Sequence, residues 1–232
     1  MSIHEKTDSH CEAIDWFFDF ISPFAYIQHK QLEKKNPPLS INYRPILFAG
    51  LLKHWSHRGP AEIPEKRTMT YQYCHWYAEK EGIPYRTPPS HPFNPLSLLR
   101  LSVSQNNAPQ IVSSIFDAIW GKGLDMLEPQ NWNHLTRQLG IANPLDQITQ
   151  QWVKDELKQN TENAIEMGLF GVPTISVKGK LFWGCDMTDM ALAHLKDPCI
   201  FDSAEYRRLE NLPVAQSRVS SKTETTDDET RT

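Results

Sequence analysis

The sequence lacks the features of several functional classes. Its 232 residues carry 24 Lys and Arg against 28 Asp and Glu, so a net charge of -4 gives no general attraction to nucleic acid or to an anionic membrane surface. No window approaches the run of about 18 apolar residues that a membrane span needs. No Gly-rich phosphate loop and no G-x-S-x-G elbow occur, which argues against ATP-dependent and α/β-hydrolase chemistry. We therefore expect neither nucleic acid nor a membrane as a partner.

Cysteine is scarce and scattered. Cys11, Cys74, Cys185 and Cys199 form no C-x-x-C motif, which argues against a disulfide framework and against a dithiol redox centre. The polar first residues lack the apolar core of a secretory signal. We expect reduced, mostly structural thiols in a cytoplasmic protein.

Histidine gives only a weak indication of a metal site. His54 and His57 lie in the segment HWSH, and Cys74 and His75 follow downstream. Zinc ligands usually come in tighter pairs, and histidines beside tryptophan often serve amphipathic packing. We expect no metal.

The first part of the chain predicts a βαβ unit. Residues 14–21, IDWFFDFI, combine β-branched and aromatic residues over a strand length. Apolar residues at near-helical spacing follow from Pro23 to about Lys35, and a second strand fits residues 39–48. A strand, a crossover helix and a strand place the two strands parallel in one sheet.

In the middle of the chain the spacing of the apolar residues changes and becomes helical throughout. From residue 48 to about 160, segments with helix-spaced apolar residues are separated by Pro or Gly. A last helix over 151–168 precedes residues 172–184, which alternate around a Lys178-Gly179-Lys180 turn like a β-hairpin. A closing helix is expected from about Met187 to Leu195.

These elements predict a domain organisation. An α/β domain of residues 12–47 and 161–212, built as βαβ and ββα, is interrupted by an all-helical insertion of residues 48–160. Residues 213–232 are too polar to bury a core, so we expect a disordered tail there.

Ser22 and Pro23 mark the start of the first helix. Serine caps free backbone N–H groups, and proline suits the first helical position. The same geometry has a functional interpretation, because a helix N-terminus at the carboxyl end of a strand favours a bound anion such as a thiolate. From these residues alone, capping is the stronger interpretation.

Val172 and Pro173 open the third strand. Proline in a sheet is confined to strand starts and edges, so an ordinary strand-opening proline is the simpler interpretation. A cis bond there would turn the Val172 backbone outward, where its N–H and C=O groups could pair with an extended, peptide-like ligand.

Aspartates mark two further junctions. Asp186 lies where a strand ends and a helix starts, with Asp189 three residues later, so capping is the default and a hydrogen bond to a ligand ammonium is the alternative. Asp15 and Asp19 lie on one face of the first strand. A carboxylate pair is conceivable there, but we expect one of them to cap or to pair near the sheet edge.

Three segments together resemble a known family. DFISPFAY, HPFNPLSLLRL and NTENAIEMGLFGVPTISVKGKLFWGCDMTDM are similar to the 2-hydroxychromene-2-carboxylate isomerases, which are related to kappa-class glutathione transferases. The resemblance covers residues 14–198 approximately. It implies the DsbA-like branch of the thioredoxin fold, with a thioredoxin-like βαβ and ββα domain around an inserted helical domain.

The resemblance also implies a glutathione site. Where DsbA-type oxidoreductases have C-x-x-C, this chain has Ser22-Pro23-Phe24-Ala25, so disulfide exchange at this position is excluded. The resemblance implies that the Ser22 hydroxyl hydrogen-bonds the sulfur of glutathione and helps to stabilise its thiolate.

Other site residues follow from the same resemblance. Val172 backbone groups pair with the cysteinyl part of glutathione, Pro173 fixes their direction, Asp186 holds the γ-glutamyl end, and Trp183 lines the cleft. Asn94 matches a family position near the ligand, although an Asn-Pro before a helical run is equally an N-cap.

The implied activity is an isomerisation. The thiolate adds to a conjugated carbon, permits rotation about a former double bond, and leaves again. A substrate carboxylate needs a cation, for which Lys53 and Arg58 are the first candidates and Lys66 and Arg67 the next. The alternatives are a kappa-like glutathione transferase or peroxidase and a non-catalytic thioredoxin-like binding module. The expected partners are glutathione and a small aromatic or unsaturated substrate, and a homodimer is expected.

Overall fold

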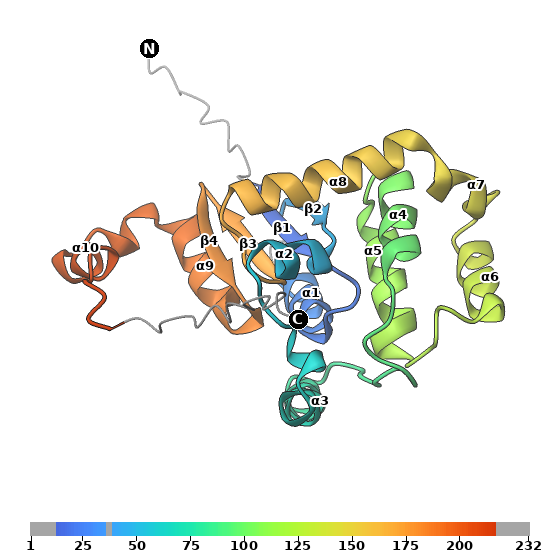
Figure 1. Cartoon of the computed structure of the whole chain (residues 1–232), viewed down its shortest axis with the longest axis horizontal. Coiled ribbons are helices and arrows are strands. Elements are labelled where there is room, and N and C mark those ends of the chain that lie inside the picture. Colours follow the sequence, from blue (N-terminus) through green and yellow to red (C-terminus); the bar gives the residue numbers. More distant parts are fainter. Residues whose placement is uncertain (1–12, 36–38, 217–232) are drawn as a thin grey trace, which may run out of the picture.

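A mixed four-stranded sheet organises the chain. The computed structural model describes residues 13–35 and 39–216 (Figure 1), so residue 12 of the predicted domain and residues 217–232 of the predicted tail lie outside the described part. The strands have the order β2-β1-β3-β4 and the bounds β1 (Ile14–Phe18), β2 (Ile41–Pro45), β3 (Thr174–Val177) and β4 (Lys180–Trp183). β1 and β2 are parallel, as expected from the βαβ pattern, whereas β3 pairs antiparallel with β1 and with β4.

The first strand is an inner strand of the sheet, and its aromatic side chains are buried. Trp16 and Phe18 are fully buried and stack with their ring centroids 4.6 Å apart. Helix α1 (Pro23–Glu33) packs against this strand, and the Trp16 indole N–H donates to the Gln28 side chain at 2.7 Å. This hydrogen bond holds the middle of α1 against the middle of β1.

Residues 48–160 are helical, as their period indicates. The α-helices that begin in this range are α2 (Phe48–His54), α3 (Pro64–Lys80), α4 (Leu96–Ser104), α5 (Pro109–Phe116), α6 (Pro129–Gln138), α7 (Pro144–Thr149) and α8 (Gln151–Glu166). Helix α5 continues into a π-helical turn, Asp117–Gly121. Helix α8 runs unbroken through residues 160 and 161, so the predicted domain boundary falls inside a helix.

The sheet and the helices share one hydrophobic core. Phe116 at the end of α5 contacts the rings of Trp16, Phe18 and Phe20, with centroids 4.7 to 6.0 Å apart. In Figure 1, α8 passes from the sheet across to α4 and α7, whereas α9 (Thr188–Lys196) lies against β3 and β4 and α10 (Ala204–Glu210) lies at the opposite end of the molecule. The end of β1 therefore meets the inserted helices directly.

The hairpin has the expected turn. Lys178 and Gly179 both adopt positive φ, at 50° and 80°, between the paired residues Val177 and Lys180. A two-residue turn with both φ values positive matches the twist of antiparallel strands. Within the described ranges, none of the helices combines the length and the apolar character needed to cross a membrane.

Candidate functional site

Ser22 caps α1 and keeps a hydrogen to donate. Its Oγ accepts a hydrogen bond from the Ala25 N–H at 3.2 Å, which confirms the predicted N-cap. Accepting this bond leaves the hydroxyl hydrogen available, because a serine hydroxyl is both a donor and an acceptor. Capping and contact with a ligand are therefore compatible in one side chain.

Asp19 organises the loop before Ser22. Its carboxylate accepts from the Ile21 N–H at 3.0 Å and from the Phe48 N–H, at the start of α2, at 2.9 Å. Burial raises the pKa of Asp19 to about 7, although both N–H donors favour the ionised form. Asp15 instead pairs with Arg44 at 3.1 Å. Each aspartate thus has the capping or pairing role expected of one of them, and they do not form a carboxylate pair.

The Val172–Pro173 peptide bond is cis, the less expected of the two alternatives. Val172 lies just before β3, and within the described residues its backbone N–H and C=O have no hydrogen-bond partner. The Pro173 carbonyl accepts from the Gly184 N–H at 2.9 Å. This bond holds the turn before β3 beside the turn that leads from Trp183 to Asp186.

A cavity of about 610 Å³ joins these junctions. Ser22, Val172 and Trp183 line it together. Its walls are mostly apolar, and they include Phe24, Phe48, Leu52, Ile63 and Phe170. The cavity thus places the first turn of α1 next to space with the apolar character of a small-molecule site.

Trp183 forms the rim of this cavity. Its ring is half exposed and meets Phe170 edge to face with the centroids 5.1 Å apart. The ring also lies so close to the Gly171 backbone that a Cβ at position 171 would collide with the indole. A side chain at position 171 would therefore displace the half-exposed indole of Trp183 from its place at the rim.

The candidate cations divide into two groups. Arg58 and Lys66 line the cavity, whereas Lys53 and Arg67 do not. Arg58 donates to the backbone carbonyl of Glu62 at 2.7 Å and so shapes the loop before α3. Lys66 is exposed, and its side chain forms no hydrogen bond or ion pair with any other described residue. Its ammonium group is available for an anion.

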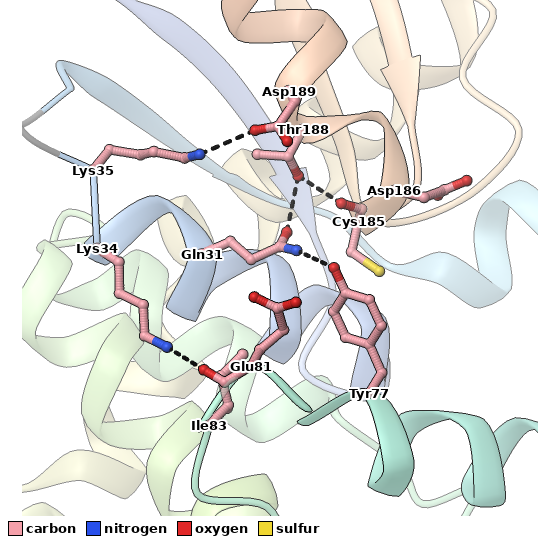
Figure 2. Close-up of a pocket in the computed structure, with 10 residues that line it drawn as sticks. All are labelled: Gln31, Lys34, Lys35, Tyr77, Glu81, Ile83, Cys185, Asp186, Thr188 and Asp189. Atoms are coloured by element: carbon pink, nitrogen blue, oxygen red, sulfur yellow. Dashed lines mark hydrogen bonds and ion pairs between the residues drawn. The ribbon is translucent and has the colours of Figure 1, made fainter. Parts of the chain in front are cut away.

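Asp186 borders a second, polar pocket of about 250 Å³. There Gln31 of α1 donates to the Tyr77 hydroxyl at 2.9 Å and accepts from the Thr188 hydroxyl at 3.0 Å (Figure 2). Lys35 pairs with Asp189 at 3.1 Å across the same pocket. The carboxylate of Asp186 points away from this network in Figure 2 and is exposed.

Asn94 lies outside the linings of both cavities. Its Oδ1 accepts from the Leu96 N–H at 3.0 Å at the start of α4. This bond to the N–H two residues later is an Asx-type turn just before α4, whose N-cap position is Pro95 and has no side-chain cap bond, so Asn94 is neither the predicted N-cap nor in a cavity lining.

Sequence reasoning missed His91. Its Nε2 lies 2.8 Å from the Ile21 carbonyl and its Nδ1 lies 2.7 Å from the Tyr71 hydroxyl. A carbonyl only accepts, so Nε2 carries the hydrogen and the neutral Nδ1 accepts from Tyr71. Burial lowers the pKa of His91, which favours this neutral ring. The contact joins residues 70 positions apart, and the His-Pro pair in HPFNPL was its only local indication.

The histidines weighed as metal ligands have other neighbours. His54 packs edge to face on Trp55, and His75 lies 3.4 Å from Glu79 one helical turn away. In the part of the chain that the structure describes, no three His, Cys, Asp or Glu side chains are arranged to hold a metal ion.

Known proteins are similar to this chain in sequence and in fold. The sequence pattern of the DsbA-like thioredoxin domain matches residues 13–196. The chain belongs to the DsbA-like thioredoxin family. A 2-hydroxychromene-2-carboxylate isomerase from Sphingobium xenophagum is 27% identical over 194 residues, which are 80% of this chain and 99% of that protein. The glutathione S-transferase kappa 1 of Caenorhabditis elegans is 24% identical over 208 residues, 80% of this chain and 91% of its own.

A solved structure supports the same fold. The structure of a 2-hydroxychromene-2-carboxylate isomerase superposes with a TM-score of 0.73 at 23% identity and covers 87% of this chain and 100% of its own. These findings confirm the resemblance and the predicted α/β fold with inserted helices. The helix start of this chain, Ser22-Pro23-Phe24-Ala25, contains no cysteine and so offers no thiol for disulfide exchange.

Proposed function

We propose that this DsbA-like protein is a glutathione-dependent isomerase of the 2-hydroxychromene-2-carboxylate type. The observation that carries the proposal is the Ser22 hydroxyl: it caps α1 through its oxygen, retains its hydrogen, and lines a cavity of about 610 Å³. The relatives named as isomerases and as kappa-class transferases support it, because their sequences align over most of this chain.

The residues present fit a tripeptide thiol. The unpaired backbone N–H and C=O of Val172 match the two hydrogen bonds that an extended peptide offers, and Pro173 sets their direction. Asp186, at the adjoining turn but outside the lining of this cavity, supplies an exposed carboxylate for the γ-glutamyl ammonium, and Trp183 lines the cavity beside Val172. Asn94 is not part of this proposed set, because it lies outside the cavity lining and its side-chain oxygen accepts from the Leu96 N–H.

The chain stabilises negative charge near Ser22. Glutathione, when bound, supplies a thiolate nucleophile that is regenerated at the end of the reaction. Ser22 donates its hydroxyl hydrogen toward the sulfur, and the N-terminus of the 11-residue helix α1 adds a favourable partial charge. The apolar walls exclude water, which strengthens both interactions.

The cavity suits a flat, unsaturated substrate with one acidic group. Phe24, Phe48 and Phe170 offer aromatic walls, and Lys66 and Arg58 offer cations at the rim. Lys66 is the better candidate for the substrate carboxylate, because Arg58 already donates to the Glu62 carbonyl. Lys53 lies outside this lining and is not part of the proposal.

A charge deletion tests the role of Lys66. We expect Lys66→Met to raise KM for a carboxylate substrate about fivefold with little change in kcat, because an exposed ion pair contributes roughly 1 kcal/mol to binding in both ground and transition states. Steady-state kinetics measure this split. Lys53→Met is the matched control, because Lys53 is also exposed and lies outside the cavity lining, and an equal rise of KM in both variants contradicts the assignment.

Glutathione binding tests the proposal itself. Titration of the protein with glutathione, followed by calorimetry and by the ultraviolet absorbance of the thiolate, is expected to show a bound thiol whose pKa lies below that of free glutathione. Absence of binding, or binding without a lowered thiol pKa, rejects the proposal.

Product analysis separates the alternatives. An isomerase turns over a chromene carboxylate with catalytic glutathione and leaves it unconsumed, whereas net conjugate formation favours the kappa-like transferase, to which the chain is nearly as similar. A non-catalytic binding module would keep its function after loss of Ser22. A homodimer and a cytoplasmic location also belong to the proposal, and sedimentation velocity tests the first.

A further inference from the structure

The loop that leads from β1 to Ser22 is held by side chains of the inserted helical part. The Trp120 indole N–H, from the π-helical turn after α5, donates to the Phe20 carbonyl at 2.9 Å. The His91 Nε2–H donates to the Ile21 carbonyl at 2.8 Å. Two successive carbonyls before the helix cap are therefore fixed by residues 100 and 70 positions later in the chain.

His91 is itself held on three sides. The Tyr71 hydroxyl of α3 donates to Nδ1 at 2.7 Å, and the ring packs edge to face on Trp120 with the centroids 5.3 Å apart. His91 also lines the large cavity, beside Ile21 and Ser22. With both ring nitrogens engaged, His91 has no free lone pair or N–H for proton transfer to a substrate.

We propose that His91 is a positioning residue, which through the Ile21 carbonyl fixes the orientation of Ser22 and of the first turn of α1 toward the cavity. The effect of His91 on a bound thiolate rests on the proposed function, whereas its effect on the position of Ser22 does not. Because the loop before Ser22 is fixed by hydrogen bonds from other parts of the chain, the Ser22 hydroxyl keeps one orientation. Preorganised donors of this kind stabilise a developing or bound anion more than mobile ones. The inserted helices thereby contribute to the thiolate site as well as to the substrate cavity.

The first experiment uses the ligand-free protein. Hydrogen exchange of the Ile21, Ser22 and Ala25 amides is compared between wild type, His91→Phe and His91→Gln. His91→Phe keeps a planar ring and removes both hydrogen bonds, whereas glutamine can place an amide donor near the Nε2 position. We expect exchange to rise about tenfold in His91→Phe, as for loss of one hydrogen bond, and to return toward wild type in His91→Gln.

A matched control separates positioning from general destabilisation. His194 is also buried, against Phe182 and Phe201, and does not line either cavity. His194→Phe is expected to leave exchange at Ile21, Ser22 and Ala25 unchanged. Unchanged exchange in a folded His91→Phe, or an equal rise in the His194→Phe control, overturns the inference. If His91→Phe does not fold, Tyr71→Phe replaces it, and unchanged exchange there overturns the inference as well.

The second measurement links positioning to the proposed chemistry. In the same variants, the affinity for glutathione and the pKa of the bound thiol are measured by calorimetry and thiolate absorbance. We expect His91→Phe to weaken binding about tenfold and to raise the thiol pKa, with partial rescue by His91→Gln. Wild type that binds no glutathione rejects the proposed function alone, because the exchange experiment still decides the role of His91.

Discussion

Replacement of Ser22 by alanine is expected to reduce kcat/KM about 100- to 1000-fold. This is the range found when one donor to a developing or bound anion is removed from a preorganised site. The pKa of the bound glutathione thiol should rise by about one to two units, because a hydrogen bond to a charged group contributes roughly 1.5–3 kcal/mol. Kinetics with a chromene carboxylate and the ultraviolet absorbance of the thiolate measure the two effects.

The cap must be separated from the chemistry in this experiment. Ser22→Ala also removes the acceptor for the Ala25 N–H, which costs about 1 kcal/mol of stability in a typical N-cap. Ser22→Thr retains a hydroxyl in both roles and is expected to keep most activity. Ser203→Ala removes the cap of α10, far along the chain from the cavity, and should lower stability alone. Full activity in a folded Ser22→Ala eliminates Ser22 as the residue that stabilises the thiolate.

Much of this site could be predicted from the sequence, because its helix cap and its strand start each depend on a few neighbouring residues. A serine and a proline before helix-spaced apolar residues specify the cap of α1, and the Val-Pro pair before an alternating run specifies the start of β3. Each depends on neighbours within a few positions. Their convergence on one cavity follows from the topology, since β1 and β3 are adjacent strands.

What the pattern could not predict depends on contacts between distant residues. The second strand ends at Pro45 rather than residue 48, because Phe48 begins α2 and its N–H is bound by Asp19, 29 positions earlier. His91 donates to the backbone carbonyl of Ile21, 70 positions earlier. Every residue has such a carbonyl, so the residue type at position 21 gives no sign of the contact. Helix α8 crosses the predicted domain boundary because one amphipathic helix packs on β2 and α2 at one end and on α4 and α7 at the other.

Asp19 is expected to make the protein less stable at pH 8 than at pH 5. The unfolded carboxyl ionises near its ordinary pKa of 3.8, whereas burial raises the pKa of the folded one to about 7. Between these values the folded state binds more protons than the unfolded state, so the free energy of unfolding falls as the pH rises. Integrated from pH 5 to pH 8, the loss from this one group is about 3 kcal/mol.

Asp19→Asn isolates this contribution, since asparagine cannot ionise. Urea unfolding at both pH values should show a loss of stability between pH 5 and pH 8 that is about 3 kcal/mol smaller in the variant than in wild type. Glu33, whose pKa is lowered chiefly by its contact with His29, affects both proteins equally and cancels in the difference. Asp15→Asn, at the half-exposed end of the same strand, is the control and should leave the wild-type difference unchanged. The same pH dependence in wild type and Asp19→Asn contradicts a buried, protonated Asp19. Asparagine retains one acceptor for the Ile21 and Phe48 N–H groups, so a cost that is independent of pH is expected and does not affect the comparison.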